Sequence, residues 1–440
     1  MGETFYLETL GCPKNAVDSD KVTATLLADG LRPADGPEQA DLVVVNTCAF
    51  VEAARQESID TALALADLKQ PDARLVVTGC MAERYGDELA EALPEVDAVV
   101  GFGGEGSLAT FLGRAPMGVR DLLELPRAAP SVPWAYVKVA EGCDRACAFC
   151  AIPSFRGTQR SRTPDSLVAE AGALVDGGVA ELVLVAQDLA WYGRDVGEPD
   201  SLVPLLARLD ALRPRGLRRV RLLYLYPSEV RDPLVATMLE LESVVAYFDL
   251  SLQHAAPGLL RSMKRWGSGE RFLAMIEGIR AQEPAAAFRS SFIVGFPGET
   301  EADHDALTSF VAAAELDWAG FFPFSSEDGT PAATMEGAVD ERVMHERLRE
   351  LGELQDRITA ASRDRLVGDE IEVLVDGVLA EDGRGGALVG RTHREAPEID
   401  GVVRVPGATA PPGALIRAVV TDALGPDLVA TPQRFRRECA

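Results

Sequence analysis

Residues 141–150 read EGCDRACAFC, and this stretch decides how the rest of the chain is interpreted. Three cysteines, Cys143, Cys147 and Cys150, are spaced C-x₃-C-x₂-C on a predicted loop that follows a strand-like run. A loop this compact can turn three thiolates onto three corners of a [4Fe–4S] cluster, which leaves the fourth iron open. Structural zinc is the alternative, but zinc needs four closing ligands and no further cysteine or histidine lies nearby. The spacing therefore predicts a cluster with one open iron.

The sequence around and after this loop repeats a strand–helix pattern. Six strand-like runs alternate with helical stretches, at residues 136–139, 181–186, 220–226, 247–252, 288–294 and 318–322. Such repeats predict a parallel sheet with crossover helices, and six of them favour an open (β/α)₆ partial TIM barrel over a flat sheet. Each run leads into polar or glycine-rich residues, which mark the functional rim of a barrel.

The flanking regions predict two further units and complete an α/β multidomain chain. Before the barrel, strand-like runs at 4–10, 42–46, 75–78 and 96–100 alternate with helical stretches at 19–28 and 52–66, which predicts a second parallel sheet. After a charged helix at 340–365, five short runs with Gly/Pro turns predict a small antiparallel β-barrel, at 371–378, 386–392, 401–405, 414–420 and 427–431. We expect domains at 1–125, 134–365 and 366–437, with a Pro/Ala-rich linker at 126–133.

A second group of cysteines is scattered along the N-terminal region. Cys12, Cys48 and Cys80 each lie at the end of a predicted strand, beside glycine or threonine. Adjacent parallel strands would bring all three to one sheet edge, where ligand sites in such sheets lie. The sequence therefore predicts a second three-cysteine metal site at this edge. The alternative, which stays open, is that the three are ordinary buried thiols. Cys439, next to the C-terminus, is interpreted as incidental.

Composition and charge exclude several classes of protein. The 440 residues carry a net charge of −26, which opposes strong binding to free nucleic acid. No run approaches the length of a membrane span and the N-terminus does not resemble a signal peptide, so we expect a soluble cytoplasmic protein without a disulfide framework. Arg156, Arg160 and Arg162 form one local basic strip, which is either directed at a ligand or a solvated face. A G-x-G-x-x-G match at 101–106 is interpreted as a turn.

The cysteine loop resembles that of the radical S-adenosylmethionine superfamily, in which an aromatic residue, here Phe149, precedes the last cysteine. The resemblance implies that the open iron chelates S-adenosylmethionine. An electron from the cluster then cleaves the cofactor to methionine and a 5′-deoxyadenosyl radical, which abstracts a hydrogen. It also implies that residues after the second and fifth strands help Phe149 to hold the cofactor, namely Gln187, Asp188, Gly295, Pro297 and Glu299.

The order of the three parts resembles the methylthiotransferases over essentially the whole chain, with a terminal barrel of the TRAM type. This resemblance implies that Cys12, Cys48 and Cys80 hold a second [4Fe–4S] cluster, whose open iron carries the sulfur that is delivered to the substrate. It implies two S-adenosylmethionine molecules per turnover, a sulfur donor, and an electron donor such as flavodoxin or ferredoxin. We expect no catalytic residues beyond the two clusters.

Two substrate classes occur in this family: an adenosine beside the tRNA anticodon, and an aspartate β-carbon in small-subunit ribosomal protein S-twelve. Residues 11–15, 46–51, 151–157 and 395–401 resemble the second, RimO-type class, and the tRNA enzymes carry Gln-Met or similar in place of Pro13-Lys14. The segment after residue 365 carries twelve acidic residues against eight arginines and no lysine, which suits a basic protein partner better than tRNA. The tRNA substrate and a non-catalytic metal-binding ribosome factor remain the alternatives.

Overall fold

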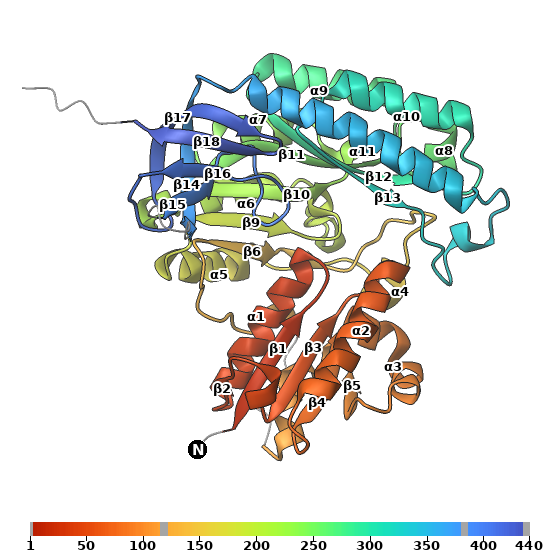
Figure 1. The fold of residues 1–440 in the computed structure, drawn as a ribbon, viewed down its shortest axis with the longest axis vertical. Coiled ribbons are helices and arrows are strands. Elements are labelled where there is room, and N and C mark those ends of the chain that lie inside the picture. The colour runs from red at the N-terminus through yellow and green to blue at the C-terminus, as the bar shows by residue number, and fades with distance from the viewer. Residues whose placement is uncertain (1–2, 115–121, 380–385, 434–440) are drawn as a thin grey trace, which may run out of the picture.

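The computed structural model describes residues 3–114, 122–379 and 386–433, and it contains the predicted parallel sheet, open barrel and small closed barrel (Figure 1). The N-terminal sheet has five parallel strands in the order β2-β1-β3-β4-β5. Its strands are β1 (Thr4–Thr9), β2 (Arg32–Pro33), β3 (Leu42–Thr47), β4 (Arg74–Gly79) and β5 (Ala98–Val100). This order changes direction between β1 and β3, and such a switch point opens a crevice at the carboxyl ends of the strands.

Three helices connect the strands of this sheet: α1 (Pro13–Ala28), α2 (Glu52–Leu68) and α3 (Cys80–Ala92). The first helix begins six residues before the predicted 19–28 segment, because Pro13 occupies the first helical position and Cys12 is the N-cap. The first turn of α1 lacks the apolar period that revealed its later part. The G-x-G-x-x-G match leads from β5 into the 3₁₀ segment Phe102–Leu112, so it does not open an α-helix.

The central sheet has six parallel strands in chain order, and it does not close on itself. Its strands are β6 (Trp134–Lys138), β9 (Glu181–Val185), β10 (Arg219–Leu225), β11 (Val244–Gln253), β12 (Ala287–Val294) and β13 (Trp318–Pro323). Its helices are α4 (Ile152–Arg156), α5 (Pro164–Asp176), α6 (Leu202–Asp210), α7 (Asp232–Glu240), α8 (Pro257–Ser262), α9 (Gly269–Gln282), α10 (Glu301–Ala314) and α11 (Glu341–Asp364). The predicted open (β/α)₆ barrel is confirmed.

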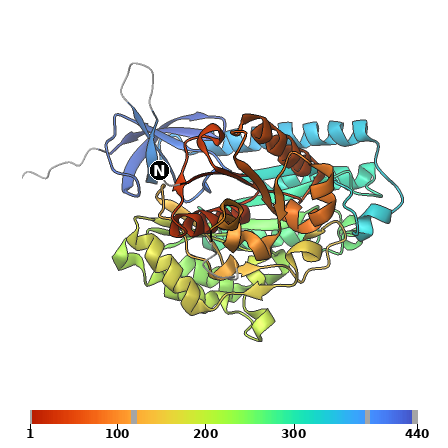
Figure 2. The same ribbon diagram turned by 90° about the horizontal axis from the view of Figure 1, so that it is seen from below.

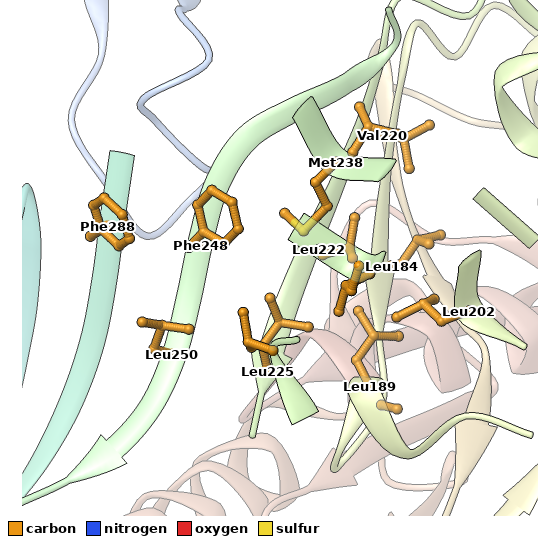
Figure 3. Close-up of a cluster of buried hydrophobic side chains, with 14 of the residues drawn as sticks. Leu184, Leu189, Leu202, Val220, Leu222, Leu225, Met238, Phe248, Leu250 and Phe288 are labelled. Atoms are coloured by element: carbon orange, nitrogen blue, oxygen red, sulfur yellow. The ribbon is translucent and has the colours of Figure 1, made fainter. Parts of the chain in front are cut away.

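Apolar side chains on the outer face of this sheet form the largest core. Figure 3 shows Leu184, Leu222, Leu225 and Phe248 on neighbouring strands, packed toward helical residues such as Met238. All five side chains are at most 1% exposed. Because the outer face is sealed in this way, the polar residues of the barrel are confined to its interior and its rims.

The C-terminal barrel is closed, in the order β14-β15-β16-β18-β17. Its strands are β14 (Glu370–Leu379), β15 (Ala387–Arg391), β16 (Val403–Pro406), β17 (Leu415–Leu424) and β18 (Asp427–Pro432). The predicted small antiparallel β-barrel is confirmed, with the difference that one pair of its strands, β16 and β18, runs parallel. Closure of a five-stranded barrel requires one such pair, since an odd number of strands cannot alternate in direction around a ring. Cys439 lies outside the described residues.

The loop between β15 and β16 fills the amino-terminal mouth of the central barrel. Ala396 is fully buried against residues that begin the barrel strands, including Tyr136, Tyr247 and Trp318. The hydroxyl of Tyr247 donates to Asp400 at 2.7 Å, and the indole nitrogen of Trp318 donates to the Arg394 carbonyl at 2.6 Å. This loop therefore covers the amino-terminal end of the barrel interior.

The N-terminal sheet unit covers that open side (Figures 1 and 2). Helix α1 packs along the first barrel strand, β6. At the other edge, Glu327 follows β13, is 2% exposed and forms ion pairs with Arg55 at 2.5 Å and Arg84 at 2.7 Å. Among the described residues, no helix combines the length and apolar character that a membrane span requires.

Candidate active site

The three cysteines of the C-x₃-C-x₂-C motif lie on the loop that follows the short strand β7 (Ala140–Glu141). This strand pairs with β8 (Arg160–Ser161). Gly142 has a φ of +76°, and a Cβ atom there would lie 2.1 Å from the Thr158 carbonyl oxygen, so only glycine fits. The backbone of Cys143 donates to the Gly157 carbonyl at 3.0 Å, which folds the loop back onto itself. Cys143, Cys147 and Cys150 interact electrostatically with one another, so the structure brings the predicted group together.

The environment of these thiols suits a metal cluster. Burial raises the pKa of Cys143 to about 11 and that of Cys150 to about 12, so both are protonated at neutral pH without a metal. Arg265 donates to the Cys147 sulfur at 3.4 Å, and the backbone of Arg145 donates to the Cys143 sulfur at 3.4 Å. An iron–sulfur cluster held by these cysteines would take the place of the thiol protons, and these donors would stabilise the anionic sulfur.

The second group of cysteines lies at one edge of the N-terminal sheet, as predicted. Cys12 follows β1, Cys48 follows β3 and Cys80 follows β4, and these three strands are neighbours. Gly11 lies so close to the end of β3 that an added Cβ would sit 2.8 Å from the Cβ of Cys48. Cys12 is the N-cap of α1 and Cys80 is the first residue of α3. The positive ends of both helices therefore face this sheet edge, which favours anionic sulfur there.

The three N-terminal thiols differ in acidity. Burial raises the pKa of Cys80 to about 12 and also raises that of Cys48. Burial acts in the same direction on Cys12, but the positive charges of Lys14 and Arg156 outweigh it and hold the pKa of Cys12 below its ordinary value. The cations that produce this effect would also offset the negative charge of a thiolate-bound cluster.

Arg156 joins the two groups of cysteines. It ends helix α4, which begins two residues after Cys150, and its side chain is 1% exposed. Its guanidinium donates to the Cys80 sulfur at 3.0 Å and to Asn15 at 2.7 Å. It also donates to Glu141 at 2.8 Å, and Glu141 lies two positions before the first loop cysteine. One buried side chain thus links the Cys80 sulfur to the carboxylate that precedes the C-x₃-C-x₂-C loop.

The basic strip suggested by the sequence is not a strip on one face. Arg156 and Arg162 are 6% and 5% exposed, whereas Arg160 is exposed. Arg162 pairs with Glu170 at 2.8 Å, behind the barrel wall. Arg156 ends α4, Arg160 lies in β8 and Arg162 follows β8, so the three side chains belong to different local structures, which their shared charge did not indicate.

The residues after the second barrel strand present unpartnered polar atoms beside the cysteine loop. Gln187 donates to Glu141 at 3.1 Å, while its Oε1 atom is buried without a described partner. Asp188 accepts from Arg145 at 2.7 Å, and its Oδ1 atom is likewise buried and unpartnered among the described residues. Buried acceptors of this kind need a donor, so they fit a polar cofactor at this rim. Burial raises the pKa of Asp188.

The residues after the fifth barrel strand form a tight turn. The Gly295 backbone donates to Glu299 at 2.5 Å, and Arg347 of α11 pairs with the same carboxylate at 2.9 Å. An added Cβ at Gly295 would meet the Met344 sulfur at 2.5 Å. Pro297 lies within this turn, and Phe149 packs in the apolar cluster beneath it. The carboxylate of Glu299 therefore binds groups of the turn and of α11. A contact with a cofactor stays a prediction for Glu299, Gly295, Pro297 and Phe149.

A row of stacked side chains along the same rim was not predicted from the sequence. Arg194 lies over Trp191 at 4.3 Å, Arg145 lies between Trp191 at 4.1 Å and Tyr226 at 3.8 Å, and Arg265 covers the other side of Tyr226 at 4.0 Å. These residues come from four separate loops, so no sequence pattern could have indicated the stack. It ends at Arg265, which contacts the Cys147 sulfur and so places two cations beside the first site.

The donor sets fit iron–sulfur clusters. Among the described residues, no three Cys, His, Asp or Glu side chains are close enough to hold a single metal ion. A cubane cluster presents its irons at separate corners, so its thiolates stand further apart than ligands of one ion. Three thiols, nearby cations and unpartnered acceptors for a further ligand are the features that such a site requires.

Comparison with protein families gives three matches in the expected order. The uncharacterized protein family UPF0004 matches residues 4–101, the radical SAM superfamily matches residues 137–311 and the TRAM domain matches residues 367–432. The first match contains Cys12, Cys48 and Cys80 and the second contains the C-x₃-C-x₂-C loop. The two cysteine groups therefore belong to two different family regions.

A solved structure shows a similar fold at low sequence identity. The radical S-adenosylmethionine methyltransferase TsrM from Kitasatospora setae, solved with cobalamin and a [4Fe–4S] cluster, aligns with a TM-score of 0.55. The sequence identity is 16%, and the alignment covers 88% of this chain and 82% of TsrM. The likeness concerns the fold alone.

Several relatives match nearly the whole chain, and each is named ribosomal protein uS12 methylthiotransferase RimO. The protein from Kineococcus radiotolerans is 41% identical over 97% of this chain and 96% of its own length. The one from Nocardioides sp. is 42% identical over 96% of each chain, and one from Anaeromyxobacter sp. is 43% identical over 98% of this chain and 94% of its own. This chain belongs to the RimO family of radical S-adenosylmethionine methylthiotransferases.

Proposed function

We propose that this enzyme adds a methylthio group to the β-carbon of an aspartate in small-subunit ribosomal protein uS12. The reaction would use two [4Fe–4S] clusters and two S-adenosylmethionine molecules per turnover. One observation supports this most strongly: the chain holds two groups of three cysteines, and the side chain of Arg156 runs from the Cys80 sulfur of one group to Glu141, which precedes the loop of the other. Insertion of sulfur at a C–H bond needs both a radical generator and a sulfur carrier, and the chain provides a site for each.

The two sites would divide the chemistry. Cys143, Cys147 and Cys150 would hold the cluster that, with S-adenosylmethionine bound, supplies hydrogen abstraction, and the N-terminal cysteines would hold the cluster that supplies sulfur. Gln187 and Asp188 offer the buried acceptors for the cofactor. Phe149 and the turn with Gly295, Pro297 and Glu299 shape the same rim.

The N-terminal unit contributes by excluding water. It covers the open side of the barrel from α1 at one edge to Glu327 at the other. Reactive species formed between the sites are protected from solvent when such a site is closed. We assign residues 1–125 to this unit, 126–133 to a linker, 134–365 to the barrel and 366–437 to the TRAM unit.

The partners follow from the same assignment. The acidic segment after residue 365 suits a basic ribosomal protein through complementary charge. The relatives named above act, by their names, on uS12. We further propose a cytoplasmic location, a sulfur donor, and an electron donor such as flavodoxin or ferredoxin.

Mass spectrometry after anaerobic turnover tests the proposal. Reconstituted enzyme, reductant, sulfide and S-adenosylmethionine are incubated with a peptide copying the uS12 loop or with a tRNA anticodon stem-loop. We expect a methylthio mass gain on the aspartate of the peptide and none on the RNA. A methylthio mass gain on the RNA alone would contradict the proposed protein substrate. Zinc in place of iron in the anaerobic protein would contradict the proposed radical chemistry.

A further inference from the structure

Lys14 is a buried cation that has no carboxylate partner among the described residues. It lies in the first turn of α1, two residues after Cys12, and is 8% exposed. Its ammonium forms no ion pair or hydrogen bond with any described residue, and its one close partner is the ring of Tyr224, whose centroid lies 3.6 Å away. Removing a charge from water is costly unless an opposite charge or several hydrogen bonds compensate for it.

The other buried lysines make the exception clear. Lys138 is fully buried and contacts the carboxylates of Asp18 and Glu141. Lys21 is also fully buried, with Glu170 4.0 Å away and the Leu123 carbonyl accepting at 2.6 Å. Both lysines thus have carboxylate partners within the fold, whereas Lys14 has none among the described residues. The Tyr224 ring compensates only in part, because a ring face attracts a cation without supplying a full opposite charge.

The backbone at Tyr224 is strained where it meets Lys14. Tyr224 has a φ of +64°, in a conformation that non-glycine residues rarely adopt, at a register shift between Leu222 and Leu225. Its backbone nitrogen is held by the Asp249 carboxylate at 2.9 Å. Strain of this kind persists when the surrounding structure holds it, and it concentrates at functional sites.

The same strand connects Lys14 with the first cysteine site. Tyr224 lies near the end of β10 and interacts electrostatically with Cys12. Tyr226, two residues further on, is stacked between Arg145 and Arg265, and Arg265 contacts the Cys147 sulfur. Lys14 and Tyr224 therefore lie beside the N-terminal cysteines, on a strand whose end is linked through Tyr226 and Arg265 to the first cysteine site. Tyr224 packs with residues of the barrel interior, and under the proposed function the substrate carbon must reach both sites.

We propose that the ammonium of Lys14 binds the side-chain carboxylate of the aspartate that is modified. This inference rests on the proposed function and names the group that recognises the substrate. In aspartate the carboxylate carbon is bonded directly to the β-carbon, so a fixed carboxylate fixes the reacting carbon. A buried cation also rejects a neutral side chain, because binding it would leave the ammonium unpaired.

A substrate–enzyme double-substitution cycle tests the inference by equilibrium binding. Two fluorescently labelled uS12-loop peptides, one with the target aspartate and one with asparagine in its place, are titrated anaerobically with the iron-loaded enzyme. The wild type should bind the aspartate peptide about tenfold or more tightly than the asparagine peptide. Lys14→Met should bind both with similar affinity, because only the aspartate peptide loses a partner.

Two variants and one analysis control the result. Lys14→Arg keeps the charge and should retain most of the discrimination. Lys69→Met makes the same chemical change near Asp97, at the end of α2, and should retain all of it. Iron and sulfide content must match the wild type in each variant, which separates substrate recognition from an effect of Lys14 on the adjacent cluster.

The outcomes are distinguishable. Loss of discrimination in Lys14→Met alone, with full iron content, supports the inference. Equal weakening of both peptides, or no change in either, overturns it, while methylthiolation of the aspartate peptide by the wild type still upholds the proposed function. A wild type that neither binds nor modifies the aspartate peptide overturns the proposed function and the inference together.

Discussion

The two cysteine sites are built in opposite ways. The first is a single loop of eight residues from Cys143 to Cys150, closed by backbone hydrogen bonds and a required glycine at position 142. The second gathers Cys12, Cys48 and Cys80 from three strand ends, over a span of 69 residues. A loop site is fixed by local geometry, whereas a site assembled from strand ends depends on the whole sheet. The first should therefore tolerate damage elsewhere in the chain, and the second should not.

The largest effect should separate the two sites by their chemistry. Cys147→Ala should reduce 5′-deoxyadenosine formation to background, because the site that binds S-adenosylmethionine is lost. Cys48→Ala should leave that formation intact and abolish methylthio product. Both products are quantified by liquid chromatography and mass spectrometry, with Cys439→Ala as the matched control. Cofactor cleavage that survives Cys147→Ala would contradict the division of labour.

Removal of the side chain that joins the sites should destabilise the fold. Arg156→Met removes the guanidinium donor to Asn15 and one of the buried cations beside Glu141, which keeps its contact with Lys138. Loss of one partner of a buried pair costs about 3–5 kcal/mol, so we expect a loss near the lower end of that range. Anaerobic urea denaturation measures the change in the free energy of unfolding. Arg208→Met, which breaks an exposed pair with Asp165, should change it by less than about 1 kcal/mol. Equal effects of the two substitutions would show that Arg156 is not a structural link.

Loosening the contact between the two sheets should uncouple the sites without destroying either. Glu327→Gln removes the ion pairs with Arg55 and Arg84 at the far edge of the barrel opening. We expect iron content to stay constant while the ratio of methylthio product to 5′-deoxyadenosine falls about tenfold, because a small misplacement of reacting groups slows transfer strongly. A parallel loss of both products would mean that the contact supports the clusters themselves.

The smallest effect on the two cysteine sites should come from a substitution at the opposite end of the barrel. Burial raises the pKa of Asp400 to about 6, against the opposing effect of Arg289 and the Tyr247 hydroxyl. The folded state then binds this proton more tightly than the unfolded state, so Asp400 costs stability as pH rises from about 4 to 6. A rise of about two pKa units corresponds to about 3 kcal/mol, so Asp400→Asn should gain up to about that amount relative to the wild type between pH 4 and pH 7, measured by thermal denaturation. Both cysteine sites should be unaffected.

The contrast between the sites also shows what could be predicted from sequence. The C-x₃-C-x₂-C loop was recognisable because its ligands are close in the chain, and the N-terminal group because Cys12, Cys48 and Cys80 each followed a strand-like run. The strand order 2-1-3-4-5 then placed them together. The six barrel strands were predictable because buried parallel strands are short apolar runs separated by helices.

The features that escaped prediction depend on side-chain direction. The stack of arginines and aromatic rings draws residues from separate loops, and a one-dimensional pattern does not contain their contacts. Arg156 and Arg162 were grouped by charge, yet both are buried in different places. The one parallel pair in the small barrel, β16 with β18, follows from ring closure and not from any residue type.

The loop that fills the amino-terminal mouth of the central barrel has a consequence for the evolution and engineering of the chain. Ala396, Asp400 and the Arg394 carbonyl belong to the terminal barrel in sequence, but they complete the interior wall of the catalytic unit. Deleting the terminal barrel would therefore open a solvent channel behind the active site. A chimera that exchanges this barrel for that of a tRNA-modifying relative must also carry a loop that fits the amino-terminal mouth. Without such a loop, water would enter the barrel interior from that end.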